Sequence, residues 1–311
     1  MKLAETDLAI VGAGITGLAI AQQMAARGRQ VTLLDKGWHP GGRFSSRRLG
    51  DGEAVVEQGV SRFELPSAHR WWSGDGLRRL RPVAGGAEAA LRESARAFIA
   101  VQAGGLSIIN PVHVATLRHL PSGAWELLAD DDASICRATQ VVVTCPAPQT
   151  AELIAPAFPD RATELASLSY SSRWTITGSI DRRARVDVTR LVPQFEQIER
   201  GTVFAGASRQ VLRLQAGDGW SVARQNHSPE EVADEMRKTL ESAGAAGLDE
   251  LRAKHWRYAL AEAQERRYTG AIGAGLLIGG DWSEPGGLTQ GVERALRAAD
   301  RLVGELNAGA A

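Results

Sequence analysis

The chain has 311 residues, 44% of them hydrophobic and 23% charged, values that are typical of a folded globular protein. Lysine and arginine together number 36, as do aspartate and glutamate, so the formal net charge is zero. This balance offers no electrostatic footprint for nucleic acid, and a nucleic-acid partner is not expected.

Cysteine usage and the N-terminus indicate the compartment. Cys136 and Cys145 form no CxxC motif and no cluster with metal-ligand spacing, so we expect reduced core residues and no metal site. Glu5 and Asp7 break any signal-peptide pattern, and the apolar run that follows is too short to cross a membrane. A cytoplasmic protein without a membrane role is expected.

The first elements in chain order are a buried strand at 7–12, a helix at 15–28 and a second strand at 30–35. The stretch from 36 to about 73 is rich in Gly, Arg and Ser and is expected to be irregular. A helix is expected over about 87–101. Shorter strands are then predicted at 106–110, 113–119, 124–129, 140–146, 173–181 and 209–216.

The C-terminal third begins with a strongly marked helix at 228–244. Ser228 is its expected N-cap, Pro229 occupies the first helical position, and Glu231 completes a capping box. A strand follows at 275–282, and a long helix at 289–306 ends the chain.

This order predicts an α/β protein: a Rossmann-type, GR2-like FAD-binding domain with an inserted substrate domain of mixed β-sheet plus helices. The FAD-binding domain is expected to be discontinuous, over 1–75, 100–155 and 270–311. The substrate domain is expected over 76–99 and 156–269.

The motif GxGxxG lies between the first strand and the first helix, at Gly12, Gly14 and Gly17. Glycines there permit a tight turn and let backbone N–H groups approach a pyrophosphate, whose charge then lies at the helix N-terminus. With 34 glycines in the chain the pattern alone is weak, but its place between a strand and a helix strengthens it.

Asp35 ends the second strand, where an acid can bind a ribose hydroxyl and disfavours a 2′-phosphate. An NAD-like cofactor or FAD remains. Arg43, in the sequence Gly41-Gly42-Arg43, is a suitable cation for the pyrophosphate of an extended FAD. The alternative is an Arg-rich solvated loop.

These residues, followed by Ser45-Ser46-Arg47, resemble the flavin amine oxidase superfamily, and more narrowly its renalase-like branch. Four further stretches carry the narrower resemblance and spread it over almost the whole chain: VEQGVSRF at 56–63, VVVTCPAPQTAELI at 141–154, KHWRYALAE at 254–262 and GGDWSEPGGLTQGVERALRAADRL at 279–302.

The resemblance implies FAD and assigns its contacts. Because no cysteine lies in the C-terminal part, a thioether link to the flavin is not expected and the FAD should be noncovalent. Groups of residues would meet the pyrophosphate, the adenosine ribose, the adenine, the ribityl chain and the flavin, and the last helix would direct its N-terminus at the flavin N1/C2=O edge. The implied residues are Gly12, Gly14, Ile15, Thr16, Gly17, Asp35, Lys36, Gly42, Arg43, Gln58, Gly59, Val114, Gly280, Asp281, Leu288, Thr289 and Gln290.

The sequence departs from the family at two places near the flavin. Family members usually carry Asp-x-Gly-x-x-Tyr-Phe where this chain has residues 57–63, with Arg62 in place of the tyrosine. They often carry Arg-Val-Glu-Gly where this chain has residues 288–291, with Gln290 in place of the glutamate.

The candidate catalytic residues are His255, Trp256, Arg257, Tyr258 and Trp282. The aromatic rings and the imidazole suit the stacking of a flat substrate, and the arginine suits a carboxamide or phosphate. The alternative is a half-buried strand with Trp256 and Tyr258 in the core. A further hypothesis places Lys254 beside flavin N5, where it would hold a water molecule.

The resemblance implies an oxidoreductase that oxidises a small planar substrate, the dihydronicotinamide isomers of NAD(P), with O2 reduced to hydrogen peroxide. Hydride transfer from a dihydropyridine needs no general base. An FAD-dependent amine or specialised-metabolite oxidase or dehydrogenase is one alternative, and a non-catalytic FAD-binding protein is another.

Overall fold

The computed structural model describes residues 3–50, 54–64, 79–83, 88–203, 208–287 and 290–308. Its largest sheet has a parallel centre with strand order β17-β11-β1-β2-β8, and antiparallel strands complete it. The strands are β1 (Ala4–Val11), β2 (Val31–Leu34), β8 (Ser107–Ile109), β9 (Thr116–His119), β10 (Trp125–Leu128), β11 (Ser134–Val143), β16 (Gly270–Gly273) and β17 (Leu276–Ile278).

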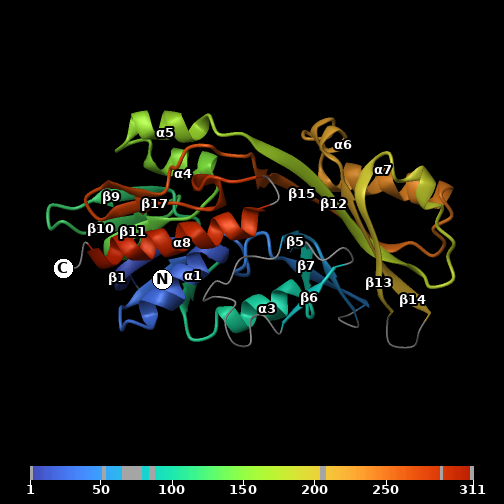
Figure 1. Cartoon of the computed structure of the whole chain (residues 1–311), viewed down its shortest axis with the longest axis horizontal. Helices are drawn as coiled ribbons and strands as arrows, with labels where there is room; N and C mark the ends of the chain where they lie inside the picture. Colours follow the sequence, from blue (N-terminus) through green and yellow to red (C-terminus); the bar gives the residue numbers. More distant parts are fainter. Residues whose placement is uncertain are drawn as a thin grey trace.

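Helices cover both faces of this sheet (Figure 1). On one face lie α1 (Ile15–Ala25), α3 (Ala95–Gln102) and α8 (Gly291–Ala308), which share one hydrophobic core. On the other face lie α4 (Ala147–Ile154) and α5 (Pro159–Ala166). Because both faces are covered, β1 and β11 end in uninterrupted apolar runs, the buried residues Leu8–Val11 and Val141–Val143.

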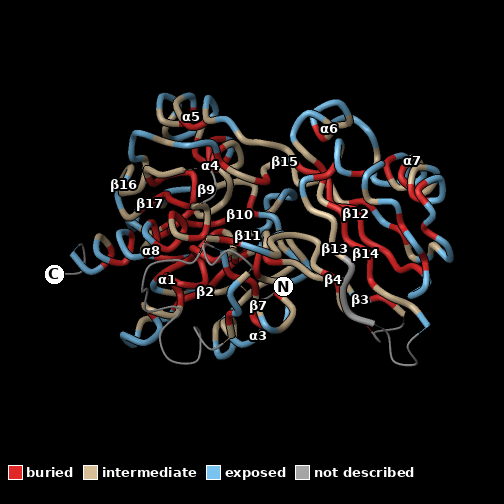
Figure 2. The backbone as a smooth tube through the Cα atoms, turned by 45° about the vertical axis from the view of Figure 1, so that its right-hand side comes forward, coloured by how far each residue is buried: buried red, intermediate tan, exposed pale blue. Residues whose placement is uncertain are grey.

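A second, antiparallel sheet has the strand order β13-β14-β12-β15. Its strands are β12 (Tyr170–Asp181), β13 (Phe195–Val203), β14 (Arg209–Ala216) and β15 (Asp249–Ala261), with the helical segments η3 (Val188–Arg190), α6 (Asp218–Val222) and α7 (Pro229–Ser242). Helix α7 packs on one face of this sheet. Figure 2 shows that the middle strands of both sheets are buried.

The capping box of α7 is confirmed. The Ser228 hydroxyl accepts a hydrogen bond from the Glu231 N–H at 3.1 Å, and the Glu231 carboxylate accepts one from the Ser228 N–H at 2.7 Å. These reciprocal bonds satisfy two N–H groups that a helix start would otherwise leave unpaired.

The stretch 36–73, expected to be irregular, contains strands in its described part. β3 (Ser46–Leu49) and β4 (Ala54–Glu57) form an antiparallel pair, and β5 (Phe63–Glu64) joins a small sheet with β6 (Leu80–Pro82) and β7 (Glu88–Leu91). Leu49, Ala54 and Val56 pack with Val211 of β14. The expectation was wrong: β3 and β4 form a local hairpin that packs on β14, and β5 pairs with the more distant β7.

The prediction of a single helix over about 87–101 was also wrong. The described residues form β7 first, and α3 begins only after Ser94, whose hydroxyl accepts a hydrogen bond from the Ala97 N–H at 3.2 Å. The alanines Ala89 and Ala90 have good helix propensity, but pairing with β5 and β6 prevails.

Candidate functional site

The glycine-rich turn between β1 and α1 has a different role for each glycine. Gly12 has a φ of +106°, and its N–H donates to the Leu34 carbonyl at 2.8 Å. A Cβ at Gly17 would lie 2.0 Å from the Gly12 carbonyl oxygen, so a side chain does not fit there. A Cβ at Gly14 would meet no atom within 4 Å. The turn therefore leaves open space beside Gly14.

That open space lies at the start of α1. Gly14 is the N-cap and supplies no side-chain hydrogen bond, so the first N–H groups of the helix are not capped by it. Ile15 is buried, and the Thr16 hydroxyl donates to the Ala295 carbonyl of α8 at 3.2 Å. Uncapped N–H groups beside open space are suited to an anion such as a pyrophosphate.

Asp35 lies directly after β2, next to the same turn. Its carboxylate accepts hydrogen bonds from the N–H groups of Ala13 and Gly37, each at 2.7 Å. Burial raises the pKa of Asp35, and these two bonds oppose the shift. Lys36 is exposed, and Val114 is buried in the core cluster that contains Leu34.

The Gly41-Gly42-Arg43 segment is folded against the glycine-rich turn. The Gly41 N–H donates to the Ala13 carbonyl at 2.7 Å, and a Cβ at Gly42 would lie 3.4 Å from the Gly14 Cα. The Arg43 side chain points away from this turn, toward β15 and Asp281. It donates to the Ala259 carbonyl at 2.9 Å and pairs with both carboxylate oxygens of Asp281.

The Gly280-Asp281-Trp282 turn, with η4 (Asp281–Ser283), therefore meets the N-terminal segment. Asp281 is 4% exposed, and the buried Trp282 donates from Nε1 to the Cys145 carbonyl at 2.9 Å. The Gly280 N–H donates to the Ser283 hydroxyl. The predicted contacts Leu288 and Thr289 lie outside the described residues. The Gln290 side chain accepts a hydrogen bond from the Gly287 N–H at 3.0 Å.

Gln58 and Gly59 form a turn that contacts β15. Trp256 donates from Nε1 to the Gln58 carbonyl at 2.7 Å, and a Cβ at Gly59 would lie 3.2 Å from the same indole ring. The Lys254 ammonium lies 4.1 Å from the centre of that ring and 3.5 Å from the Ser45 hydroxyl. Burial lowers the pKa of Lys254.

The remaining HWRYA residues do not gather at this turn. His255 stacks on Trp174 with ring centres 4.5 Å apart and interacts with the Ser172 hydroxyl at 2.7 Å. Burial, followed by the charge of Arg257, lowers the pKa of His255. Successive strand residues face opposite sides, so His255 lies on the α7 side, away from Lys254 and Trp256. Arg257 is exposed.

The segment is a strand, as the alternative to a catalytic role predicted, but its aromatic residues are not core residues. Trp256 and Tyr258 are both partly exposed. The Tyr258 ring meets Tyr170 edge to face at 5.3 Å, and the Tyr170 hydroxyl accepts a hydrogen bond from the Ala147 N–H. Burial raises the pKa of Tyr170 and keeps the hydroxyl neutral.

Two buried arginines near the site were not singled out from the sequence. Arg213 of β14 is 1% exposed and reaches the Glu57 and Gly59 carbonyls. Arg294 of α8 is fully buried and donates to the Ala261 and Glu262 carbonyls. A signal for Arg213 was available, because this charge stands between two leucines in an apolar strand.

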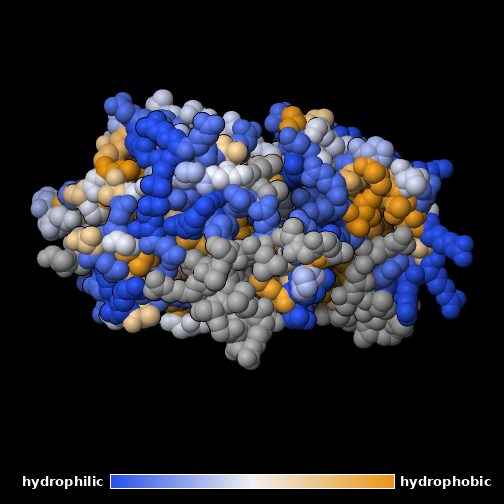
Figure 3. All heavy atoms as spheres, viewed as in Figure 1, coloured by the Kyte–Doolittle hydropathy of each residue, from blue (hydrophilic) through white to orange (hydrophobic). Residues whose placement is uncertain are grey.

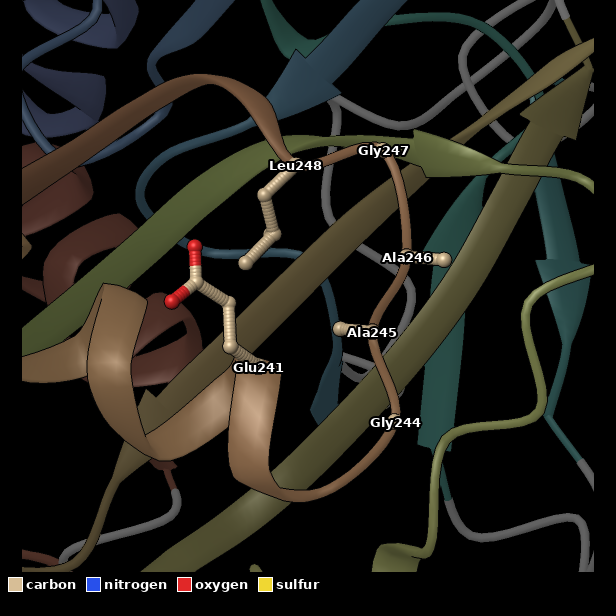
Figure 4. A pocket seen from close by; sticks show the side chains of 6 residues that line it. All are labelled: Glu241, Gly244, Ala245, Ala246, Gly247 and Leu248. Carbon is tan, nitrogen blue, oxygen red and sulfur yellow. The ribbon is translucent and has the colours of Figure 1, made fainter.

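Two surface hollows lie at the second sheet, apart from the glycine-rich turn. Figure 4 shows one between Glu241 at the end of α7 and the loop that leads into β15. The other is lined by Val188, Val192, Phe195, Glu196 and Ile198, and Figure 3 shows a hydrophobic patch in this region on a largely hydrophilic face. Within the described residues, none of the helices is long and apolar enough to cross a membrane.

Residues 10–75, which contain the glycine-rich turn and Asp35, match the family of NAD(P)-binding Rossmann-like domains. The chain is 55% identical over 38 residues to a 4,4'-diapophytoene desaturase (4,4'-diaponeurosporene-forming) of Staphylococcus haemolyticus strain JCSC1435. That match spans 12% of this chain and 8% of the desaturase.

Solved structures share the fold over the whole chain. Cyclohexylamine oxidase from Brevibacterium oxydans IH-35A has a TM-score of 0.67 at 14% identity, with 97% of this chain and 99% of that chain covered. Putrescine oxidase bound to putrescine has a TM-score of 0.64 at 14% identity, with 99% and 100% covered. The predicted α/β fold class, a Rossmann-type part joined to a second mixed sheet with helices, is therefore confirmed, and the chain shares its fold with these two oxidases.

Proposed function

We propose that the protein is an FAD-dependent oxidoreductase that holds its FAD without a covalent bond. The residues present fit the group: the space beside Gly14 is open, the first turn of α1 is uncapped, and the Asp35 carboxyl is next to that turn. FAD in this site would supply a ring that accepts a hydride at N5. The oxidases and the desaturase that the chain is similar to support an oxidoreductase.

We further propose that the part built on the first sheet binds FAD and the part built on the second sheet binds the substrate. From the sequence, residues 1–75, 100–155 and 270–311 are predicted to hold FAD, and 76–99 with 156–269 the substrate; we keep this division except at 95–99. Ala95, Phe98 and Ile99 of α3 share a core with α1 and α8, so we assign α3 to the FAD-binding part. The second sheet then faces the cofactor through the contact between Trp256 and Gln58.

For the substrate we propose a small planar reduced compound, the renalase-type dihydronicotinamide isomers of NAD(P), with O2 as the electron acceptor. The observation that carries this proposal is Lys254. Its ammonium lies on the Trp256 face, and no carboxylate among the described residues pairs with it. A protonated amine would be repelled there, whereas a flat ring joined to phosphates would be attracted.

Two acids of the neighbouring strands, Glu57 of β4 and Glu199 of β13, are already engaged. Glu57 accepts hydrogen bonds from the Ser46 hydroxyl and the Ala95 N–H, and Glu199 pairs with Arg62 and Arg213. Neither is left to bind an ammonium group. The chain's residues would therefore orient the substrate and exclude water, and none is required as a general base.

An amine or specialised-metabolite oxidase is the second candidate, supported by the fold shared with putrescine oxidase and cyclohexylamine oxidase. A non-catalytic FAD-binding protein is the third. The cytoplasmic location stays a prediction from the sequence.

An anaerobic mixing experiment separates these candidates. The purified protein, saturated with FAD, is mixed with borohydride-reduced NAD that contains the 2- and 6-dihydro isomers, and absorbance is followed at 450 nm. Rapid bleaching, with β-NADH inert, is expected. Bleaching by putrescine or cyclohexylamine instead would support the amine oxidase. A flavin that no donor reduces would support the non-catalytic protein, and a protein that takes up no FAD would overturn all three.

A further inference from the structure

The turn at Glu57, Gln58 and Gly59 is held by side chains of the second sheet at three consecutive carbonyls. Arg213 donates from Nε to the Glu57 carbonyl at 3.0 Å and from Nη2 to the Gly59 carbonyl at 2.9 Å. Trp256 donates from Nε1 to the carbonyl between them, that of Gln58, at 2.7 Å. The two donor residues lie on different strands of the second sheet, Arg213 on β14 and Trp256 on β15.

The N–H groups of the same turn bind the segment that follows the glycine-rich turn. Gln58 and Gly59 donate to the Ser45 carbonyl at 2.8 and 3.2 Å, and Val60 donates to the Arg43 carbonyl at 2.9 Å. A Cβ at Gly59 would lie only 1.8 Å from the Arg43 carbonyl oxygen, so the two backbones are in direct contact. The turn therefore connects the second sheet to Arg43.

Arg213 is buried, and all of its hydrogen-bond partners belong to the turn or to the second sheet. It is 1% exposed, and its other donors meet the side-chain oxygens of Gln197 and Gln215 at 2.9 and 2.8 Å. The Glu199 carboxylate lies 3.6 Å away. A buried arginine is expensive to desolvate, and an apolar residue would pack this strand at lower cost. Packing alone does not explain an arginine here.

We propose that Arg213 is a positioning residue that, together with Trp256, fixes the Glu57–Gly59 turn and through it the Arg43 backbone against the cofactor site. This inference rests on the FAD-binding part of the proposed function and not on the identity of the substrate. Arg213 acts from the second sheet, so the fit of the cofactor depends on how the two sheets are held together.

The test compares Arg213→Lys, Trp256→Phe and their double variant with a control, Arg209→Lys. Lysine keeps the charge at 213 but lacks the planar guanidinium that donates to both carbonyls at once. Phenylalanine keeps an aromatic ring at 256 but loses the indole N–H donor. Arg209 lies on the same strand and bonds the Ser179 hydroxyl and the Gly247 carbonyl, within the second sheet and the loop before β15. The dissociation constant for FAD, the visible circular dichroism of the bound flavin and the Tm of the FAD-free protein are measured.

We expect Arg213→Lys to weaken FAD about tenfold and Trp256→Phe several-fold, with an altered flavin dichroism in both. Because both act on one turn, the double variant should lose less than the product of the two effects. Arg209→Lys should leave affinity and dichroism unchanged. If Arg213→Lys does not fold, the comparison of Trp256→Phe with Arg209→Lys still tests whether the turn positions FAD.

Lowered Tm values with wild-type FAD affinity and dichroism would overturn the inference, as would effects that simply multiply in the double variant. A wild-type protein that takes up no FAD would overturn the proposed function and this inference with it.

Discussion

Arg43 and Asp281, 238 positions apart in the chain, form a two-armed ion pair: Nη1 lies 2.9 Å from Oδ2, and Nη2 lies 2.7 Å from Oδ1. The pair joins the Gly-Gly-Arg segment to the Gly-Asp turn before α8. Both residues were expected from the sequence to contact FAD, and their pairing with each other was not. Asp281 is buried, whereas the Arg43 side chain is 30% exposed, so the carboxylate depends on the arginine more than the reverse.

Replacing Arg43 with alanine should lower the free energy of unfolding of the FAD-free protein by about 3 kcal/mol, because it leaves the Asp281 charge buried without its partner. Urea denaturation measures this loss. In Arg43→Ala/Asp281→Asn the loss should be smaller than the sum of the two single losses. Additive losses would show that the two side chains do not stabilise each other.

The glycines of the turn should separate folding from binding. Gly17→Ala should destabilise the FAD-free protein by several kcal/mol, because its Cβ would meet the Gly12 carbonyl. Gly14→Ala should cost at most about 1 kcal/mol, the loss expected for alanine at an N-cap, but it should weaken FAD at least tenfold by filling the open space. Each alanine variant is the control for the other. Full FAD affinity in Gly14→Ala would place the pyrophosphate elsewhere.

Lys254 should give a pH-dependent stability. Burial lowers its pKa in the folded protein, so the stability from this site is complete above pH 10.5 and is lost as pH falls through the lowered pKa. Lys254→Met removes that loss. Its Tm advantage over wild type should therefore be smallest above pH 10.5 and grow toward neutral pH. An advantage for Lys254→Met that does not change with pH would contradict the shift.

The capping box offers a stability change remote from the site. Ser228→Ala should lower the free energy of unfolding by about 1 kcal/mol, because the Glu231 N–H loses its acceptor. FAD affinity should not change. Thermal unfolding measures the first effect and flavin fluorescence the second. A matching loss of FAD affinity would mean that α7 is coupled to the cofactor site.

The sequence by itself determined the features that depend on neighbours a few residues away. The apolar run of β1, the glycines at 12, 14 and 17, Asp35 at the end of β2 and the capping box of α7 are all local patterns, and the structure contains each of them. Strand burial, turn conformation and helix capping are set by propensity and short-range hydrogen bonds.

Only the tertiary structure decided which of these features meet. The hairpin of β3 and β4 packs on Val211 of β14, β5 pairs with β7, and the helix expected over 87–101 lost its first part to that pairing. The contact of Arg213 with the Glu57 and Gly59 carbonyls joins residues more than a hundred positions apart. Such contacts depend on the register of two sheets and the distance between them, and local periodicity carries no record of either.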